Sequence, residues 1–152
     1  MATSHVEATL RANKTLAATF GEEIFNRGNF EMADELVAPD FAWYSPGFPE
    51  FGPGAPAVKR FAQALRTAFP DLHLTRVDAL AEGDKVADHW VATGTHRAEW
   101  MGIPATGKEV VISGIDIFRI EHGKIVELRQ IADLLSALRE LGIVPTTKLS
   151  RA

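Results

Sequence analysis

The chain has 152 residues, of which 46% are hydrophobic and 24% are charged, with a formal net charge of −4; this composition is typical of one soluble globular domain and offers no basic surface for nucleic acid. It contains no cysteine, which excludes disulfides, thiol catalysis and zinc–thiolate sites. Residues 1–19 are amphipathic and charged, unlike a signal peptide, and no apolar run approaches the ~18 residues of a membrane span, so we expect a cytoplasmic protein with no membrane partner.

The first predicted element is a helix that begins at Ser4 and ends near Gly28. Ser4 and Glu7 have the spacing of a capping box, and a glycine at the far end suits a C-terminal cap. Between these ends, apolar residues recur at helical spacing: Leu10, Ala17, Phe20, Ile24 and Phe25. A shorter helix is expected over residues 30–37, because Pro39 prevents its continuation.

An apolar loop separates the next predicted strand from the next predicted helix. Residues 41–44 are expected to form a short strand, and residues 45–55 are rich in Pro, Gly and Phe, which predicts a loop. Pro56 suits the first turn of a helix. The buried face of this helix is expected to comprise Val58, Phe61, Leu65 and Phe69.

Four strands and a last helix complete the predicted elements. Apolar patterns predict strands over 72–81, 86–95, 109–120 and 124–131, the first of them with a bulge. The turns include Gly83 and the pair His122–Gly123. A final amphipathic helix reaches Leu141, and the tail over residues 145–152 is expected to fray.

The order of these elements predicts an α+β fold. Helices come first and an antiparallel meander follows, which places helices and strands in separate parts of one domain. That domain spans residues 1–152, with a core over about residues 4–142. A curved sheet wrapped by helices leaves a cavity at its open end, where ligands commonly bind.

Seven short motifs, taken in their order along the chain, are similar to those of one known family. They are AFPDL at 68–72, AEGDKV at 81–86, GTH at 94–96, MGIPATGK at 101–108, GIDIFR at 114–119, HGKI at 122–125 and LRELG at 138–142. On these motifs the chain resembles the SnoaL-like polyketide cyclases of the nuclear-transport-factor-2-like superfamily, from about Thr15 to Gly142. Each motif alone is weak, but their order is specific to the family.

The resemblance implies a fold and a chemistry. The fold is a cone-shaped, strongly curved antiparallel sheet packed on three or four helices, with an internal pocket. The best-known members close a ring by intramolecular aldol condensation of a polycyclic polyketide ester, with no metal and no other cofactor. Other proteins of this fold are epoxide hydrolases, ketosteroid isomerases or hydroxylase components. The expected partner is a small apolar, polyketide-like substrate.

The resemblance also points to two positions on neighbouring strands. The Asp that acts as general base in the cyclases, near the end of the last long strand, corresponds to Gln130 here. A His on the preceding strand corresponds to Asp116. This chain therefore has an acid on one strand and an amide on its neighbour.

Asp116 is an ionisable residue inside an otherwise apolar strand. If the flanking Ile115 and Ile117 pack outward against helices, Asp116 faces the interior of the cone. Partial desolvation then raises its pKa above the usual value near 4, and such a carboxylate suits removal of a proton alpha to a carbonyl. The alternative is a structural ion pair with Arg119 or Arg129.

Gln130 and His96 are the other catalytic candidates. The Gln130 amide can donate to a developing enolate or hold a water; alternatively it only forms a hydrogen bond with Asp116. His96 lies at even spacing from Asp88 and Trp90, so all three share a face, and its imidazole can serve as acid, base or donor. The alternative for His96 is a structural role at the strand end.

Aromatic and apolar side chains are expected to form the substrate-binding surface, with ordinary core packing as the alternative. These residues are Trp43, Tyr44, Trp90, Trp100, Met101 and Phe118. The sequence has no metal-ligand spacing of histidines, no phosphate-binding glycine loop and no Gly-x-Ser-x-Gly motif. We therefore expect no metal site.

These observations favour a cofactor-independent cyclase or isomerase in which Asp116 moves a proton on an apolar carbonyl compound. A second hypothesis is a hydrolase of an epoxide or ester, with a water held between Asp116 and Gln130, or a hydroxylase component. A third is a module that binds an apolar ligand or a partner without chemistry. A homodimer is expected through the open face of the sheet, at His89, Val91, Arg119 and Glu127.

Overall fold

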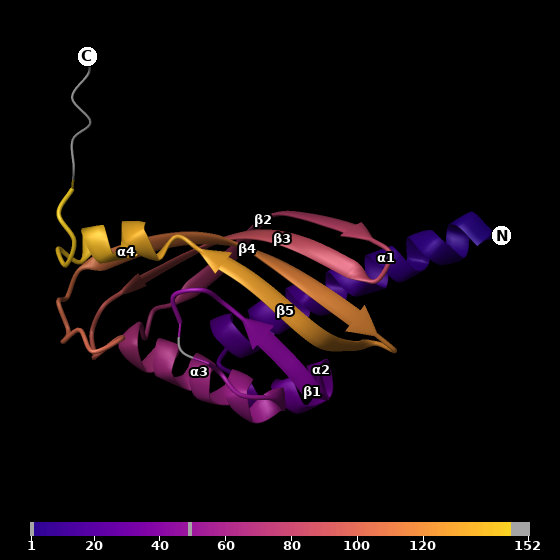
Figure 1. The fold of residues 1–152 in the computed structure, drawn as a ribbon, viewed down its shortest axis with the longest axis horizontal. Coiled ribbons are helices and arrows are strands. Elements are labelled where there is room, and N and C mark those ends of the chain that lie inside the picture. Colours follow the sequence, from indigo (N-terminus) through magenta and orange to yellow (C-terminus); the bar gives the residue numbers. More distant parts are fainter. Residues whose placement is uncertain (1, 49, 147–152) are drawn as a thin grey trace, which may run out of the picture.

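A curved five-stranded sheet partly encloses two helical segments in the computed structural model, which describes residues 2–48 and 50–146 (Figure 1). The strands lie side by side in the order β1-β5-β4-β3-β2. In chain order the elements are α1 (Ala2–Thr19), η1 (Phe20–Asn26), η2 (Phe30–Met32), α2 (Ala33–Leu36), β1 (Val37–Tyr44), α3 (Gly54–Ala68), β2 (His73–Glu82), β3 (Lys85–Thr95), β4 (Glu109–Glu121), β5 (Lys124–Ala132) and α4 (Leu134–Glu140). The predicted α+β fold is confirmed.

The four strands β2 to β5 form the predicted antiparallel meander, with ends within two residues of the predicted ones. The expected bulge in β2 lies between Arg76 and Asp78, where the register with β3 shifts. The β4–β5 hairpin turns at His122 and Gly123, which have φ angles of 50° and 73°. Two left-handed residues in succession suit a tight hairpin turn.

Strand β1 departs from the prediction in its length and its direction. The helix predicted over 30–37 already ends at Leu36, and the strand predicted from residue 41 begins at Val37. Pro39 is tolerated inside β1 because this strand lies at the edge of the sheet. β1 runs parallel to β5, with Tyr44 opposite Arg129, and this pairing brings the residue after β1 close to the end of β5.

The N-terminal helix also differs from the prediction at both ends. α1 begins at Ala2, so Ser4 and Glu7 lie inside the helix and the predicted capping box is wrong. Its last part, η1, is a π-helix. The wider turn of a π-helix places Phe20 and Phe25, five positions apart, in the core, with their ring centroids 5.7 Å apart.

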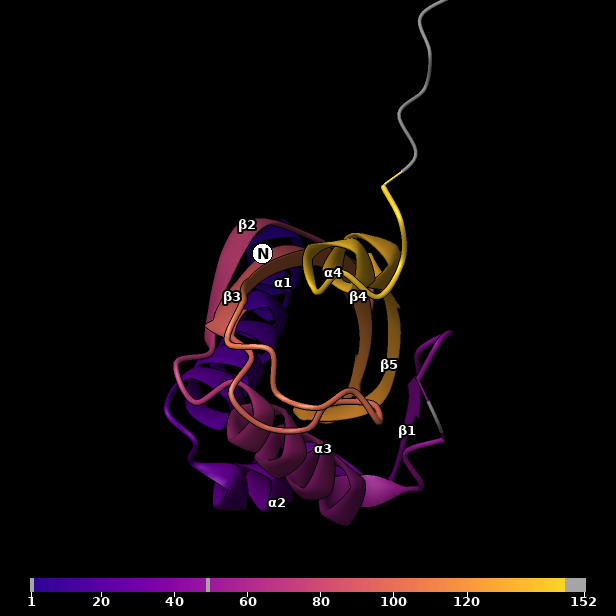
Figure 2. The same cartoon turned by 90° about the vertical axis from the view of Figure 1, so that its left-hand side faces the viewer.

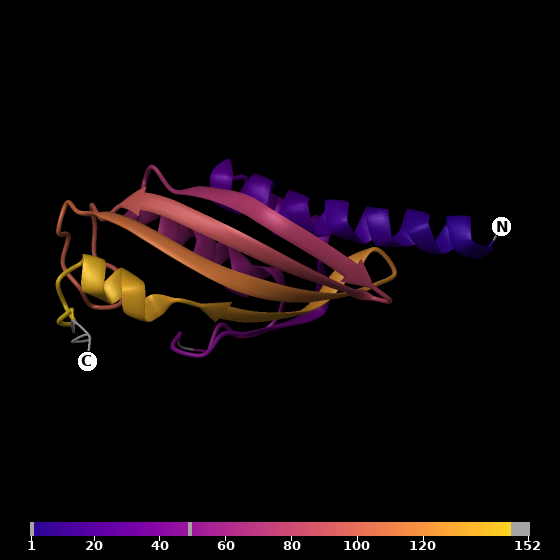
Figure 3. The same cartoon turned by 90° about the horizontal axis from the view of Figure 1, so that it is seen from above.

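α1 and α3 cover the concave face of the sheet. Figure 2 shows the sheet curving over α1 and α3, and Figure 3 shows β2 to β5 from the opposite side, uncovered by these helices. Ile115 and Ile117 do point outward, but they are 50% and 42% exposed and do not pack against helices as predicted. Of the tail predicted to fray, residues 145 and 146 are exposed, and 147–152 lie outside the described residues.

Candidate active site

A cavity of about 270 Å³ lies between the concave face of the sheet, η1 and α3. Its wall is mainly apolar and is rich in aromatic rings, which come from segments between Phe20 and Phe118. These are Phe20, Phe25, Trp43, Phe48, Phe61, Phe69, Trp90, Trp100 and Phe118. Such a wall suits a flat, apolar ligand, since aromatic faces bury much area and keep water out.

Asp116 lies in the middle of β4 and lines this cavity, with 8% of its surface exposed. Burial raises the pKa of its carboxyl from 3.8 to about 7; the N–H groups of Trp90 and Gln130 oppose this rise, and the charge of Asp88 adds to it. The alternative of an ion pair between Asp116 and Arg119 or Arg129 is not formed. Arg119 pairs with Glu121, and Arg129 pairs with Glu127. The carboxyl is therefore buried without a cation of its own.

Gln130 lies opposite Asp116 in the β4–β5 ladder and is also buried. Its Nε2 donates to Asp116 Oδ1 at 3.0 Å, and its Oε1 accepts a hydrogen bond from Ser45 Oγ at 3.1 Å. The hydrogen bond between Gln130 and Asp116 joins the two side chains directly. Asp116 Oδ2 has no hydrogen-bond partner of good geometry in the described part of the chain.

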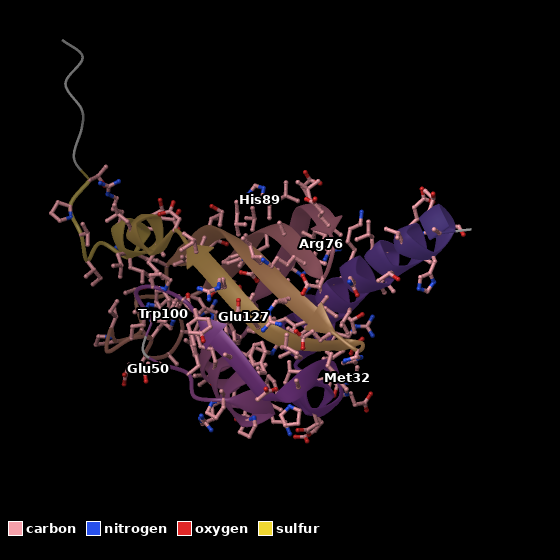
Figure 4. All side chains as sticks on the ribbon, turned by 45° about the vertical axis from the view of Figure 1, so that its right-hand side comes forward. Met32, Glu50, Arg76, His89, Trp100 and Glu127 are labelled. Carbon is pink, nitrogen blue, oxygen red and sulfur yellow. The ribbon has the colours of Figure 1, made fainter. Side chains whose placement is uncertain are left out.

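A second buried carboxylate faces the same cavity, and sequence reasoning did not assign it to the site. Asp88 lies opposite Asp116 in the β3–β4 ladder. Arg76, on β2 beside α1 (Figure 4), donates from Nε and Nη2 to the two Asp88 oxygens at 2.8 and 2.7 Å. It also donates to the backbone oxygen of Lys14 at 3.1 Å. Strand alternation places Asp88 on the same face as Trp90, but it does not show that Arg76 lies close to Asp88. Only the register between the strands reveals this ion pair.

Trp90 lies next to Asp116 because Gly114 leaves room for its ring. Trp90 is paired with Gly114 across β3 and β4, and a Cβ at position 114 would lie 2.3 Å from Trp90 Cζ2. The indole nitrogen is buried and has no acceptor in hydrogen-bonding geometry among residues 2–48 and 50–146. It is nevertheless close enough to Asp116 to favour the ionised carboxylate.

His96 is fully buried but does not line the cavity with Asp116. It follows the last residue of β3, and its ring stacks on Phe69 with centroids 5.5 Å apart. Its Nδ1 lies 3.0 Å from Thr106 Oγ1 and accepts from the Thr106 backbone N–H at 3.3 Å. Phe69 and Thr106 thus hold the ring beside the end of β3, and the buried Nε2 has no hydrogen-bond partner among the described residues.

The structure divides the expected substrate-binding residues into two groups. Trp43, Trp90, Trp100 and Phe118 line the cavity. Tyr44 is 50% exposed and lies under the Arg129 guanidinium on the outer face, because strand alternation turns it away from its buried neighbour. Met101 is 46% exposed, with φ 51°, at the corner of the turn between Trp100 and Ile103.

The contribution of η1 to the cavity was not predicted. Gly21 and Asn26 line it together with the two phenylalanines of the π-helix. The Asn26 side chain exchanges two hydrogen bonds with the backbone of Leu74, at 2.6 and 2.8 Å, and so joins η1 to β2. The periodicity of an α-helix gives no signal for a π-turn, so the sequence pattern could not reveal this wall.

The described residues contain no cluster of three His, Asp or Glu side chains arranged to hold a metal ion. None of the helices in this part of the chain is long and apolar enough to cross a membrane.

Comparisons with known proteins agree with the fold and with the sequence motifs. The sequence profile of the SnoaL-like polyketide cyclases matches residues 15–141. The chain is 30% identical over 124 residues to aklanonic acid methyl ester cyclase DnrD of Streptomyces peucetius, covering 79% of this chain and 84% of that protein. It is 29% identical over 121 residues to nogalonic acid methyl ester cyclase of Streptomyces nogalater, covering 78% and 89%. The structure of TsrD from Streptomyces laurentii superposes with a TM-score of 0.79 at 26% identity, over 88% of this chain and 97% of TsrD.

Proposed function

The chain belongs to the SnoaL-like polyketide cyclase family, and on that premise we propose that it is an enzyme that closes a ring in a polyketide ester, with Asp116 as the general base. The observation that carries this proposal is the buried carboxyl of Asp116, which faces an aromatic cavity and has no cation beside it. A base whose pKa is near the working pH is ionised in a useful fraction and still takes up a proton readily.

The proposed reaction is an intramolecular aldol addition, the ring-closing step of an aldol condensation, in which no atom enters or leaves. Asp116 removes a proton from a carbon alpha to a carbonyl, and the electron pair of that C–H bond forms an enolate. The enolate carbon then bonds to a second carbonyl carbon of the same molecule, and the C=O pair moves onto the oxygen. That oxygen takes the proton back from Asp116, so the product is an isomer of the substrate.

Neutral groups of the cavity support the charge that develops on oxygen. Gln130 uses one Nε2 proton for Asp116, and the second has no acceptor among the described residues, so it is available to the enolate oxygen. Trp100 and Phe118 are buried in the cavity wall. They exclude water, which strengthens such electrostatic contacts. His96 takes no part in this scheme.

Of the alternatives, the hydrolase has less support than the cyclase. It requires a water held between Asp116 and Gln130, whereas these two side chains bond to each other directly at 3.0 Å. A binding module without chemistry gives no reason for an uncompensated carboxyl in an apolar cavity, because burial of such a group lowers stability.

Substitution of Asp116 by Asn tests the proposed function. The probes are aklanonic acid methyl ester and nogalonic acid methyl ester, named after the substrates of the relatives. We expect cyclisation by Asp116→Asn to be at least ~100-fold slower, since general bases typically contribute factors of that size, whereas Asp78→Asn, at an exposed position of β2, should retain wild-type rates. A product that carries oxygen from labelled water would instead support the hydrolase, and equal rates for both variants would contradict the assignment of the base.

We also propose that two copies of the chain pair through the outer face of the sheet. Strand alternation places His89, Val91, Arg119 and Glu127 on this face; the His89 side chain projects from it in Figure 4. Large apolar residues lie between these groups and are between 42% and 65% exposed: Ile115, Ile117 and Ile131. An apolar patch with charged neighbours is typical of a surface that another protein covers.

A further inference from the structure

Ser45 follows β1 directly, and its hydroxyl lies beside Gln130. The parallel ladder pairs Tyr44 with Arg129, so the next residues of both strands are also neighbours. Ser45 Oγ donates to Gln130 Oε1 at 3.1 Å, and Gln130 Nε2 donates to Asp116 Oδ1 at 3.0 Å. The two hydrogen bonds form a chain that leads from the start of the apolar loop to the carboxyl group.

The direction of this chain matters because a glutamine amide has two different ends. When the NH2 end faces a carboxyl group, it favours the ionised form; when the oxygen end faces it, it favours the protonated acid, which can donate to that oxygen. Gln130 is buried and presents its NH2 end to Asp116. Its other end therefore needs a donor, and Ser45 is that donor.

We infer that Ser45 is a positioning residue for the proposed base: its hydroxyl holds the Gln130 amide with an N–H, and not the carbonyl oxygen, toward Asp116. The inference rests on the proposed function only for its catalytic consequence. Donation into the amide oxygen also polarises the amide, which strengthens the hydrogen bond from Nε2 to the carboxylate. Ser45 thereby helps Asp116 to be ionised before it takes a proton from the substrate.

Other charged groups that line the cavity stay the same when Ser45 is changed. They are Asp88 on β3, its partner Arg76 on β2, and Glu22 on η1. Any change in the titration of Asp116 in Ser45 variants therefore reports on the hydrogen-bond chain. Removal of the hydroxyl leaves Gln130 Oε1 without its donor, and the amide then gains by turning its oxygen toward a protonated Asp116.

The experiment is a carbon-detected NMR titration of the Asp116 carboxyl in matched variants. In Ser45→Ala we expect the midpoint to rise by up to about one pH unit, and in Ser45→Thr, which keeps the hydroxyl, to stay at the wild-type value. In Ser45→Cys, whose thiol is a weaker donor, the midpoint should lie between those of the alanine and threonine variants. This variant replaces Ser45→Ala in the comparison if the alanine variant does not fold. Ser113→Ala, on β4, should titrate like the wild type.

The rate of cyclisation of aklanonic acid methyl ester supplies the second readout. The loss of kcat/KM in Ser45→Ala should be larger at pH 6 than at pH 9, because the acid form of Asp116 persists to higher pH. An Asp116 midpoint that is the same in Ser45→Ala as in the wild type would overturn the inference. Failure of the proposed function has a different signature: the midpoint still depends on Ser45, while Asp116→Asn cyclises the ester as fast as the wild type.

Discussion

Two carboxyl groups lie side by side on β3 and β4, and their surroundings give them different roles. Asp88 has the guanidinium of Arg76, which contacts both of its oxygens. Asp116 has only the neutral N–H groups of Gln130 and Trp90, so burial dominates and raises its pKa to about 7. Asp88 is thus held in an ion pair, whereas Asp116 can exchange a proton near neutral pH.

The raised pKa of Asp116 has a consequence for stability that Asp116→Asn isolates. The folded pKa is about 7 and the unfolded pKa is near 4, so the folded protein holds this proton more tightly. The contribution of Asp116 to stability is therefore fully present below about pH 4 and is lost as the pH rises through about 7. We expect Asp116→Asn to match the wild type near pH 4 and to exceed its free energy of unfolding by on the order of 4 kcal/mol at pH 8.

Urea unfolding of both proteins at pH 4, 6 and 8 provides the measurement. The difference between the two free energies of unfolding should grow steadily with pH. A constant difference across this range would mean that Asp116 has the same pKa in the folded and unfolded states.

At the scale of single residues, the sequence was sufficient where strand alternation decides the direction of a side chain. Alternation placed Asp116, Trp90 and Phe118 toward the interior, and all three line the cavity. It could not give the direction of His96, which lies just beyond the strand, or of Met101, which lies in a turn. Both positions depend on loop geometry, for which the pattern of apolar residues carries no information.

At the scale of elements, the meander was predictable and the first strand was not. The strands β2 to β5 follow one another through short turns, and their apolar patterns give their limits. The pairing of β1 with β5 joins segments that are far apart in the sequence; Ser45 and Gln130, which share a hydrogen bond, are 85 residues apart. No local pattern indicates such a partner, so Ser45 could not be assigned to the site from the sequence.

Two glycines within the elements around the cavity should respond differently to alanine. A Cβ at Gly114 would meet Trp90 Cζ2 at 2.3 Å and the backbone oxygen of Ile131 at 2.8 Å, and the backbone cannot move away easily. A Cβ at Gly21 would meet only the end of the Leu74 side chain at 3.0 Å. We expect Gly114→Ala to lower the free energy of unfolding by about 1–3 kcal/mol.

Gly21→Ala is the matched control in the same thermal or urea unfolding experiment. Its free energy of unfolding should stay within about 1 kcal/mol of the wild type, because alanine also favours a helical backbone. Equal losses in the two variants would show that the close contact of Trp90 with Gly114 does not govern this part of β4.

At the scale of the whole molecule, the sheet has one face that forms the cavity and one that α1 and α3 leave uncovered (Figure 3). If the outer face pairs two copies of the chain, a charge at its centre should separate them, because burial of an unpaired charge is costly. We expect Ile117→Lys to raise the dissociation constant of the dimer at least ~10-fold, a loss of about 1.4 kcal/mol or more.

Sedimentation velocity over a range of protein concentrations measures this effect. Val6→Lys is the control, since Val6 is similarly exposed but belongs to α1, whose N-terminal end extends beyond the sheet in Figure 3. A wild-type protein that stays monomeric at all concentrations, or an Ile117→Lys variant that still pairs, would rule out this interface.

The most direct measurement for the whole account is the titration of the Asp116 carboxyl in the wild-type protein, followed by carbon-detected NMR and assigned by comparison with Asp116→Asn. It requires no substrate and addresses the property on which the proposed chemistry depends. We expect a midpoint of about pH 7, far above that of an ordinary aspartate. A midpoint near 4 would mean that the carboxyl is solvated or paired with a cation, and Asp116 could then not act as the proposed base.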